Sequence, residues 1–178
     1  MANIDNPFGF KPIGSLISGS DGLHTSEYIL ADANTVCGVG DLVELTTAGR
    51  IDVCAASATQ IVGVAAQAAD ASSGDTILVY DDPFAIFIAQ MDDGSGTGTG
   101  LAQMYGNFDF VATAATDGLS NMEIDEDSQA ATATLPLKAI GLYDGLSGKA
   151  ANAYGEFQIT KVIINNHVYK SLGVTGLT

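Results

Sequence analysis

Residues 76–90 read TILVYDDPFAIFIAQ, and this stretch decides the fold class. It contains two apolar runs, Thr76–Tyr80 and Phe84–Ile88, separated by Asp81-Asp82-Pro83. Both runs are short and rich in β-branched and aromatic residues, which pack well on a pleated sheet. Aspartate and proline are typical of the turns that bound strands. The stretch therefore predicts two β-strands with a turn between them.

The same pattern recurs along the chain. Each further segment is short, apolar and bounded by turn residues: Glu27–Ala31, Asp41–Leu45, Gly49–Val53, Ile61–Ala65, Asn107–Val111, Leu135–Leu142 and Glu156–Ile164. Evidence for helices is weak, because Cys54–Gln60 and Ala65–Ala71 contain alanine but no apolar stripe. We therefore expect an all-β, β-rich barrel or sandwich of short antiparallel strands, with one short helical turn near Leu101–Tyr105.

The N-terminal residues differ from the rest. In residues 1–20, prolines and glycines interrupt an apolar series that includes Phe8, Phe10 and Ile13. Proline forbids a helix here, and exposed phenylalanine is costly. We expect residues 1–20 to form an extended arm that docks on a neighbouring subunit, with Phe8, Phe10, Pro12 and Ile13 as the partner-binding residues. A strand packed on its own domain is the alternative.

The length of 178 residues favours one domain, residues 21–178, after this arm. The low-complexity stretch Asp92–Gly100 alternates glycine with small polar residues and is typical of a surface loop. A division into two small β subdomains near residues 92–100 is the alternative organisation.

Composition excludes some functions. Six basic residues against 21 acidic ones give a net charge of −15, which argues against a nucleic-acid binder. No run approaches the ~20 apolar residues of a membrane span, and the start lacks the pattern of a secretory signal. A chain that is 47% hydrophobic but only 15% charged suggests a surface that another protein covers. In the cytosol-like compartment that we expect, Cys37 and Cys54 are predicted to be buried free thiols.

No pattern of catalytic or metal-binding residues emerges. Gly94–Gly100 is not followed by a helix or a lysine, so it does not fit a phosphate-binding loop. His24 and His167 have no cysteine or histidine at metal-ligand spacing. The acidic segment Glu123–Asp127 is predicted to be a solvated turn, and a structural cation there remains the alternative. We expect no catalytic site, no cofactor and no metal.

An ordered series of motifs carries a family resemblance. Residues 1–12 read MANIDNPFGFKP, and they are followed in order by Glu27-Tyr-Ile29, Gly40-Asp-Leu-Val43, Thr47-Ala-Gly-Arg-Ile51, Ile61-Val-Gly-Val-Ala65, Val79-Tyr-Asp-Asp-Pro83, Leu135–Leu142 and Ile163-Ile-Asn-Asn-His167. This series resembles the capsid decoration, or cement, proteins of tailed bacteriophages.

The resemblance implies a non-enzymatic virion protein that binds the outer surface of an icosahedral shell, commonly as a trimer. Its partner would be the major capsid protein of the same virion, and it would be made in the bacterial host cytoplasm. The acidity fits the capsid exterior, because that surface does not meet the packaged DNA. Other interpretations stay open: a tail or head-closure subunit, a carbohydrate- or surface-binding β module, and an enzyme.

Overall fold

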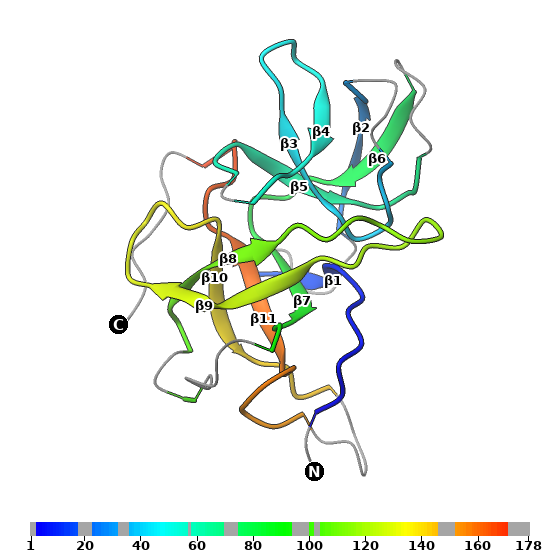
Figure 1. The fold of residues 1–178 in the computed structure, drawn as a ribbon. Helices are drawn as coiled ribbons and strands as arrows, with labels where there is room; N and C mark the ends of the chain where they lie inside the picture. Colours follow the sequence, from blue (N-terminus) through cyan, green and yellow to red (C-terminus); the bar gives the residue numbers. More distant parts are fainter. Residues whose placement is uncertain are drawn as a thin grey trace.

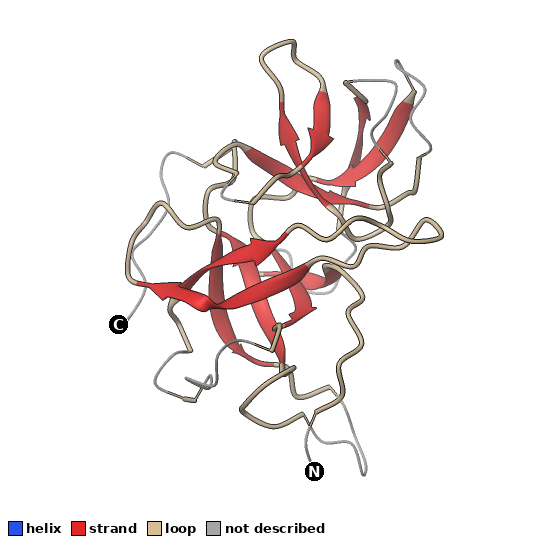
Figure 2. Ribbon diagram, viewed as in Figure 1, coloured by secondary structure: helices blue, strands red, loops and turns tan. Residues whose placement is uncertain are grey.

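The computed structural model describes residues 3–17, 23–31, 36–56, 58–69, 75–93, 100–101, 104–145 and 152–170. These residues contain strands and loops but no helix (Figure 2). The strands are β1 (Lys11–Ser15), β2 (Thr25–Ile29), β3 (Leu42–Leu45), β4 (Ile51–Val53), β5 (Ile61–Ala65), β6 (Thr76–Tyr80), β7 (Ala85–Gln90), β8 (Asn107–Val111), β9 (Glu123–Ala130), β10 (Leu137–Leu142) and β11 (Ile159–Ile164). The all-β prediction is confirmed. The expected helical turn near Leu101–Tyr105 includes residues 102–103, which lie outside the described residues.

The strands form two antiparallel sheets in a sandwich-like arrangement rather than a closed barrel (Figure 1). The six-stranded sheet has the order β1-β7-β11-β10-β8-β9, and the five-stranded sheet has the order β2-β6-β5-β3-β4. Single parallel bridges extend beyond these ladders, from Leu30 to Ile51 and from Met91 to Ile124. The second bridge brings β9 beside the end of β7, so the acidic residues of β9 lie near those that follow β7.

The chain changes sheet at the stretch that predicted the fold class. β6 lies in the five-stranded sheet and β7 in the six-stranded one, so residues 81–84 connect two sheets and do not close a hairpin. The turn is fixed locally, because the Asp82 carboxylate accepts a hydrogen bond from the Phe84 amide at 2.8 Å. The change of sheet therefore precedes residues 92–100, of which 94–99 lie outside the described residues.

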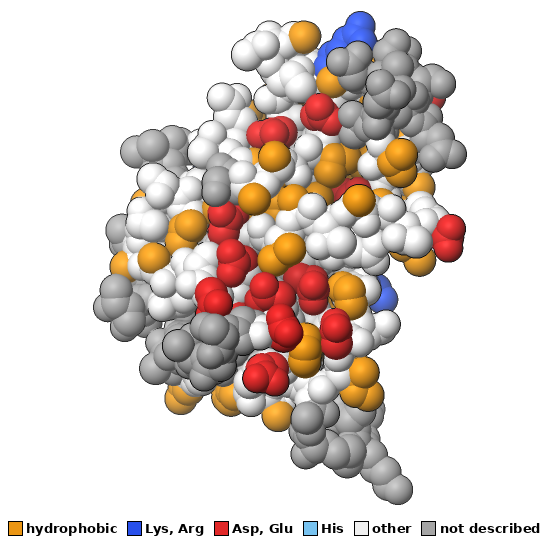
Figure 3. Space-filling view, in the orientation of Figure 1, with side chains coloured by type: hydrophobic (Ala, Val, Ile, Leu, Met, Phe, Trp, Pro, Cys, Tyr) orange, Lys and Arg blue, Asp and Glu red, His pale blue; other side chains and the backbone are white. Residues whose placement is uncertain are grey.

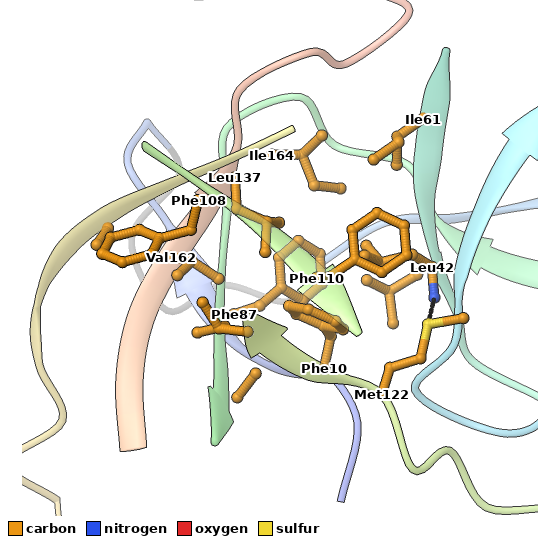
Figure 4. Packing of buried hydrophobic residues seen from close by; sticks show 14 of the residues in the cluster. Phe10, Leu42, Ile61, Phe87, Phe108, Phe110, Met122, Leu137, Val162 and Ile164 are labelled. Atoms are coloured by element: carbon orange, nitrogen blue, oxygen red, sulfur yellow. Dashed lines mark hydrogen bonds between the residues drawn. The ribbon is translucent and has the colours of Figure 1, made fainter. Parts of the chain in front are cut away.

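One apolar core joins the two sheets. Phe87, Phe108 and Phe110 come from the six-stranded sheet, and Leu42 and Ile61 come from the five-stranded sheet (Figure 4). All belong to a single cluster of buried side chains. A smaller cluster lies with the five-stranded sheet and is built from Leu30, Cys37, Val43, Ile51, Val62, Ala65, Ile77 and Val79. Because the larger cluster draws on both sheets, neither sheet covers its apolar face alone.

The predicted acidic turn is wrong. Residues Glu123–Ala130 form β9, which pairs with β8 and places Val111 opposite Glu123 and Phe110 opposite Ile124. Aspartate and glutamate are poor strand formers. The strand nevertheless forms because Ile124 is fully buried in the core while its backbone pairs with a strand that is itself buried. A short segment with one apolar residue among acids gives no local signal for this pairing.

The end of the described chain returns to the five-stranded sheet. His167 forms a bridge with Ile61, and the Val168 amide donates to the Ile61 carbonyl at 2.9 Å. The hydroxyl groups of Tyr28 and Tyr169 lie 2.8 Å apart, and the Tyr28 hydroxyl donates to Asp81 at 2.8 Å. These contacts fasten the segment that follows β11 to β5, β2 and the connection between the sheets. Where the structure is described, it has no helix long and apolar enough to cross a membrane.

Candidate functional site

The predicted partner-binding residues lie on or beside β1, and they differ sharply in exposure. Phe10 is 1% exposed and belongs to the core, whereas Ile13 is 39% exposed. Phe8 is partly buried, and Pro12 is partly buried within β1. Phe10 is thus already packed inside its own chain, which is the alternative arrangement considered for this segment. Of the four residues, Ile13 has the largest exposed fraction.

β1 is an edge strand. Its residues pair with β7 in antiparallel register, with Pro12 opposite Phe87 and Ser15 opposite Ala85. In the described residues no strand pairs with the other side of β1. An unpaired edge presents backbone donors and acceptors to solvent and can accept another strand. Proline is found at such edges because it has no N–H to donate.

Apolar side chains continue past the end of β1. Leu16 is 55% exposed and Ile17 is 70% exposed. The Leu16 amide donates to the Phe84 carbonyl at 3.0 Å, which places this turn beside the connection between the sheets. Phe84 is itself partly exposed, and the Lys170 ammonium lies 5.5 Å from the centre of its ring. We call Ile13, Leu16, Ile17 and Phe84 the apolar edge.

Residues of the N-terminal segment also line a groove of about 620 Å³. Phe8, Phe10 and Pro12 line it together with Lys11, Val39, Gly40, Ala65, Tyr80, Ile88, Leu119, Tyr143 and Ile159. The groove thus brings three of the four predicted residues together and leaves Ile13 outside its lining. Its walls are mostly apolar, with Lys11, Tyr80 and Tyr143 as their polar side chains.

Residues 3–8 precede this groove and are held by polar side chains. The Asn3 amide nitrogen donates to the carbonyl oxygens of Ala153 and Glu156, both at 2.9 Å. The side-chain nitrogen of Gln90 donates to the Ile4 carbonyl at 2.8 Å, and its oxygen accepts from the Asn6 amide at 2.8 Å. Because Gln90 is buried, this pair of bonds fixes residues 4–6 against the end of β7. Sequence reasoning missed Gln90, although it is the polar residue that ends an apolar strand.

The Phe10 position is fixed by a close approach of backbones. The Phe10 amide donates to the Gly40 carbonyl at 2.9 Å. Gly9 has a φ of +69°, and a side chain there would collide with Ser120, whose Cβ lies 2.3 Å from the position of an added Cβ. Only glycine therefore allows the segment to pass between Gly40 and Ser120 before Phe10 enters the core.

Burial shifts the pKa of both cysteines and of His167. Burial raises the pKa of the Cys37 thiol to about 12 and raises that of Cys54 as well, so both stay protonated. Both are free and buried, as expected. Burial lowers the pKa of His167 to about 4, and its Nδ1 accepts a hydrogen bond from the Tyr169 amide at 3.1 Å. His24 is exposed on the surface.

Acidic side chains gather on the face that carries β8 and β9 (Figure 3). Among the described residues, no group of three or more histidine, cysteine, aspartate or glutamate side chains could hold a metal ion. The cation considered for Asp125–Asp127 therefore finds no ligand set there. Burial, reinforced by the negative charges of Asp5, Asp92 and Asp93, raises the pKa of Glu123 to about 7.

Comparisons with models of protein families, with curated proteins and with solved structures found no match to this chain.

Proposed function

We propose that this chain is a non-enzymatic structural protein of a phage virion, which binds the outer surface of the assembled capsid and stabilises the shell. The observation that carries the proposal is the open edge of β1 together with the exposed side chains of the apolar edge. Contiguous apolar surface of this kind marks sites of protein contact. The motif series that resembles capsid decoration proteins supplies the identity of the partner.

Binding at β1 would use the backbone and the side chains together. A segment of the major capsid protein pairs with the free side of β1, and its apolar side chains pack against Ile13, Leu16 and Ile17. Phe10 then has a different role from the one expected of an exposed anchor. It holds β1 in place from within the core, so that the edge already has its binding conformation in the free protein. Less conformational entropy of the chain is then lost on binding.

Stabilisation of the shell needs no reaction. A protein that binds the assembled lattice but not the separated subunits stabilises the assembly by mass action. The net charge of −15 suits the exterior of the shell, since a lining protein would repel the packaged DNA. A trimer matches the resemblance and would place three copies of the apolar edge around a symmetry axis.

Charged substitutions in the apolar edge test this proposal. The double variant Leu16→Asp, Ile17→Asp is expected to bind empty capsid shells at least about tenfold more weakly than the wild type, because two apolar contacts are replaced by carboxylates that must be desolvated. The measurement is co-sedimentation of the purified protein with shells over a range of concentrations.

The matched control is Val36→Asp, which changes an exposed valine far from β1 in sequence and outside the apolar edge. It should bind shells as the wild type does. Equal binding by the double variant and the wild type would contradict docking through this edge. Failure of the wild type to bind shells at all would contradict the proposed function itself.

A further inference from the structure

The N-terminal residues 3–8 form a strap that is attached at its middle by one buried side chain. Gln90 bonds to residue 4 through its nitrogen and to residue 6 through its oxygen, each at 2.8 Å. Asp5 lies between these two points and is exposed. The strap therefore carries a carboxylate to a fixed place beside the end of β7.

The residues after Gln90 bring further carboxylates to the same place. The Asp92 amide donates to the Ile124 carbonyl at 3.0 Å, and the Asp92 carboxylate accepts from the Glu126 amide at 2.9 Å. Glu123 precedes Ile124 in β9, so residues 90–92 hold the strap on one side and β9 on the other. We call Asp5, Asp92, Asp93 and Glu123 the acidic cluster. Its members come from three separate segments of the chain.

The charges that act on Glu123 are all of one sign. One carboxylate oxygen of Glu123 is buried without a hydrogen-bond partner. Burial is the largest cause of its raised pKa of about 7, followed by Asp5 on the strap and by Asp92 and Asp93 after β7. Burial also raises the pKa of Asp92, and Asp125, Asp93 and Asp127 add to the rise, while the bond from the Glu126 amide opposes it. On β8, Asp109 lies opposite Asp125.

We propose that the strap is a pH-sensitive element: it is attached when Glu123 is protonated and is loosened when Glu123 ionises and repels Asp5. The acidic cluster senses pH, and the pair of bonds to Gln90 is what opens. The inference concerns the isolated chain and does not depend on the proposed function.

The direction of the effect follows from linkage. A carboxyl group whose pKa is raised in the attached state favours attachment when it is protonated, and this contribution is lost as the pH rises through the raised value. Attachment should be strongest near pH 5, where Glu123 carries its proton, should weaken as the pH rises towards the raised pKa of about 7, and should level off above it. Each pKa unit contributed by Asp5 corresponds to a tenfold change in the attachment equilibrium.

The Asn6 amide reports the state of the strap, because it donates directly to Gln90. Its hydrogen exchange, measured by NMR on the full chain and corrected for the intrinsic pH dependence of exchange, should show about tenfold lower protection at pH 8.5 than at pH 5.5. The Val162 amide, in a central strand of the core, should keep its protection over the same range. That comparison separates opening of the strap from unfolding of the domain.

Two variants locate the sensor. Glu123→Gln should keep Asn6 protected at both pH values, since the side chain can no longer ionise. Asp5→Asn should raise protection at pH 8.5 above that of the wild type and flatten the profile, because the ionised Glu123 then meets no charge on the strap. Without the Asp5 charge the pKa of Glu123 is also lower, so any remaining transition moves to lower pH. The exposed position of Asp5 makes this variant compatible with folding even where Glu123→Gln is not. The matched control Glu27→Gln changes an exposed carboxylate of β2 in the other sheet and should leave the wild-type profile unchanged.

A wild-type profile that is flat between pH 5.5 and 8.5 would overturn the proposal, as would an Asp5→Asn profile identical to that of the wild type. Neither result would bear on whether the protein binds capsid shells. Conversely, absence of shell binding would leave the pH profile of Asn6 as predicted.

Discussion

Replacing Phe10 with alanine is expected to lower the free energy of unfolding by about 4 kcal/mol. The Phe10 ring is 1% exposed and packs in the cluster that joins the two sheets, so its loss leaves a cavity as well as removing apolar contacts (Figure 4). The same ring anchors β1, whose edge carries the proposed docking surface. Chemical denaturation of the purified variant, followed by circular dichroism, measures the change.

Leu16→Ala is the control for this experiment, because Leu16 lies just past β1 but is exposed. Its effect should stay within about 0.5 kcal/mol. A loss below about 1 kcal/mol for Phe10→Ala would contradict burial of the ring within its own chain. It would return Phe10 to the role of an exposed anchor for a partner.

Replacing Gly63 with alanine is the second large effect, with an expected loss of about 3 kcal/mol or more. Gly63 lies in β5, where every residue is buried. An added Cβ would stand 2.1 Å from the Tyr80 carbonyl oxygen, which is backbone of the neighbouring strand β6 and cannot move aside as a side chain could. The added Cβ would therefore disrupt the pairing of Val64 with Tyr80 between β5 and β6. Thermal unfolding and the yield of folded protein both report the change.

Gly49→Ala is the control for this experiment, because it measures the loss of stability when a glycine is replaced without a steric clash. Gly49 has a φ of +72°, but no atom lies within 4 Å of an added Cβ there. Its replacement should cost only the backbone strain, about 1 kcal/mol. Equal effects of the two substitutions would contradict the close approach of β5 and β6.

The strands that the sequence predicted are those whose signal is local. Ile61–Ala65 and Thr76–Tyr80 match the structure at both ends, because β-branched residues bounded by turn residues carry the information within the segment itself. β9 has no such signal. Its formation depends on pairing with β8 and on burial of Ile124, and both are tertiary effects.

The sequence also did not predict which strand belongs to which sheet. β1 joins a sheet whose other strands all begin at residue 85 or later. β6 and β7 belong to different sheets although only four residues lie between them. For the candidate site, too, only part could be predicted from the sequence. The apolar residues of the N-terminal segment could be recognised from the sequence, but whether each faces the core or solvent could not. Phe10 and Ile13 differ in exposure because β1 pairs with β7, whose residues lie at least 70 positions further along the chain.

The polar contacts of the strap were the least accessible to sequence reasoning. Gln90 and residues 4–6 are separated by more than 80 positions, and no periodicity links them. The acidic residues were visible as clusters along the chain. Their convergence from three segments follows only from the fold, and it adds to the rise in the pKa of Glu123 that burial causes.

The number of copies of this chain in the purified virion tests the proposed function most directly. Quantitative mass spectrometry of intact particles gives its ratio to the major capsid protein. A capsid decoration protein should be present at a fixed ratio set by the symmetry of the shell, in numbers comparable to the major capsid protein. A few copies per particle, as for a tail or head-closure component, or absence from the particle would contradict the account.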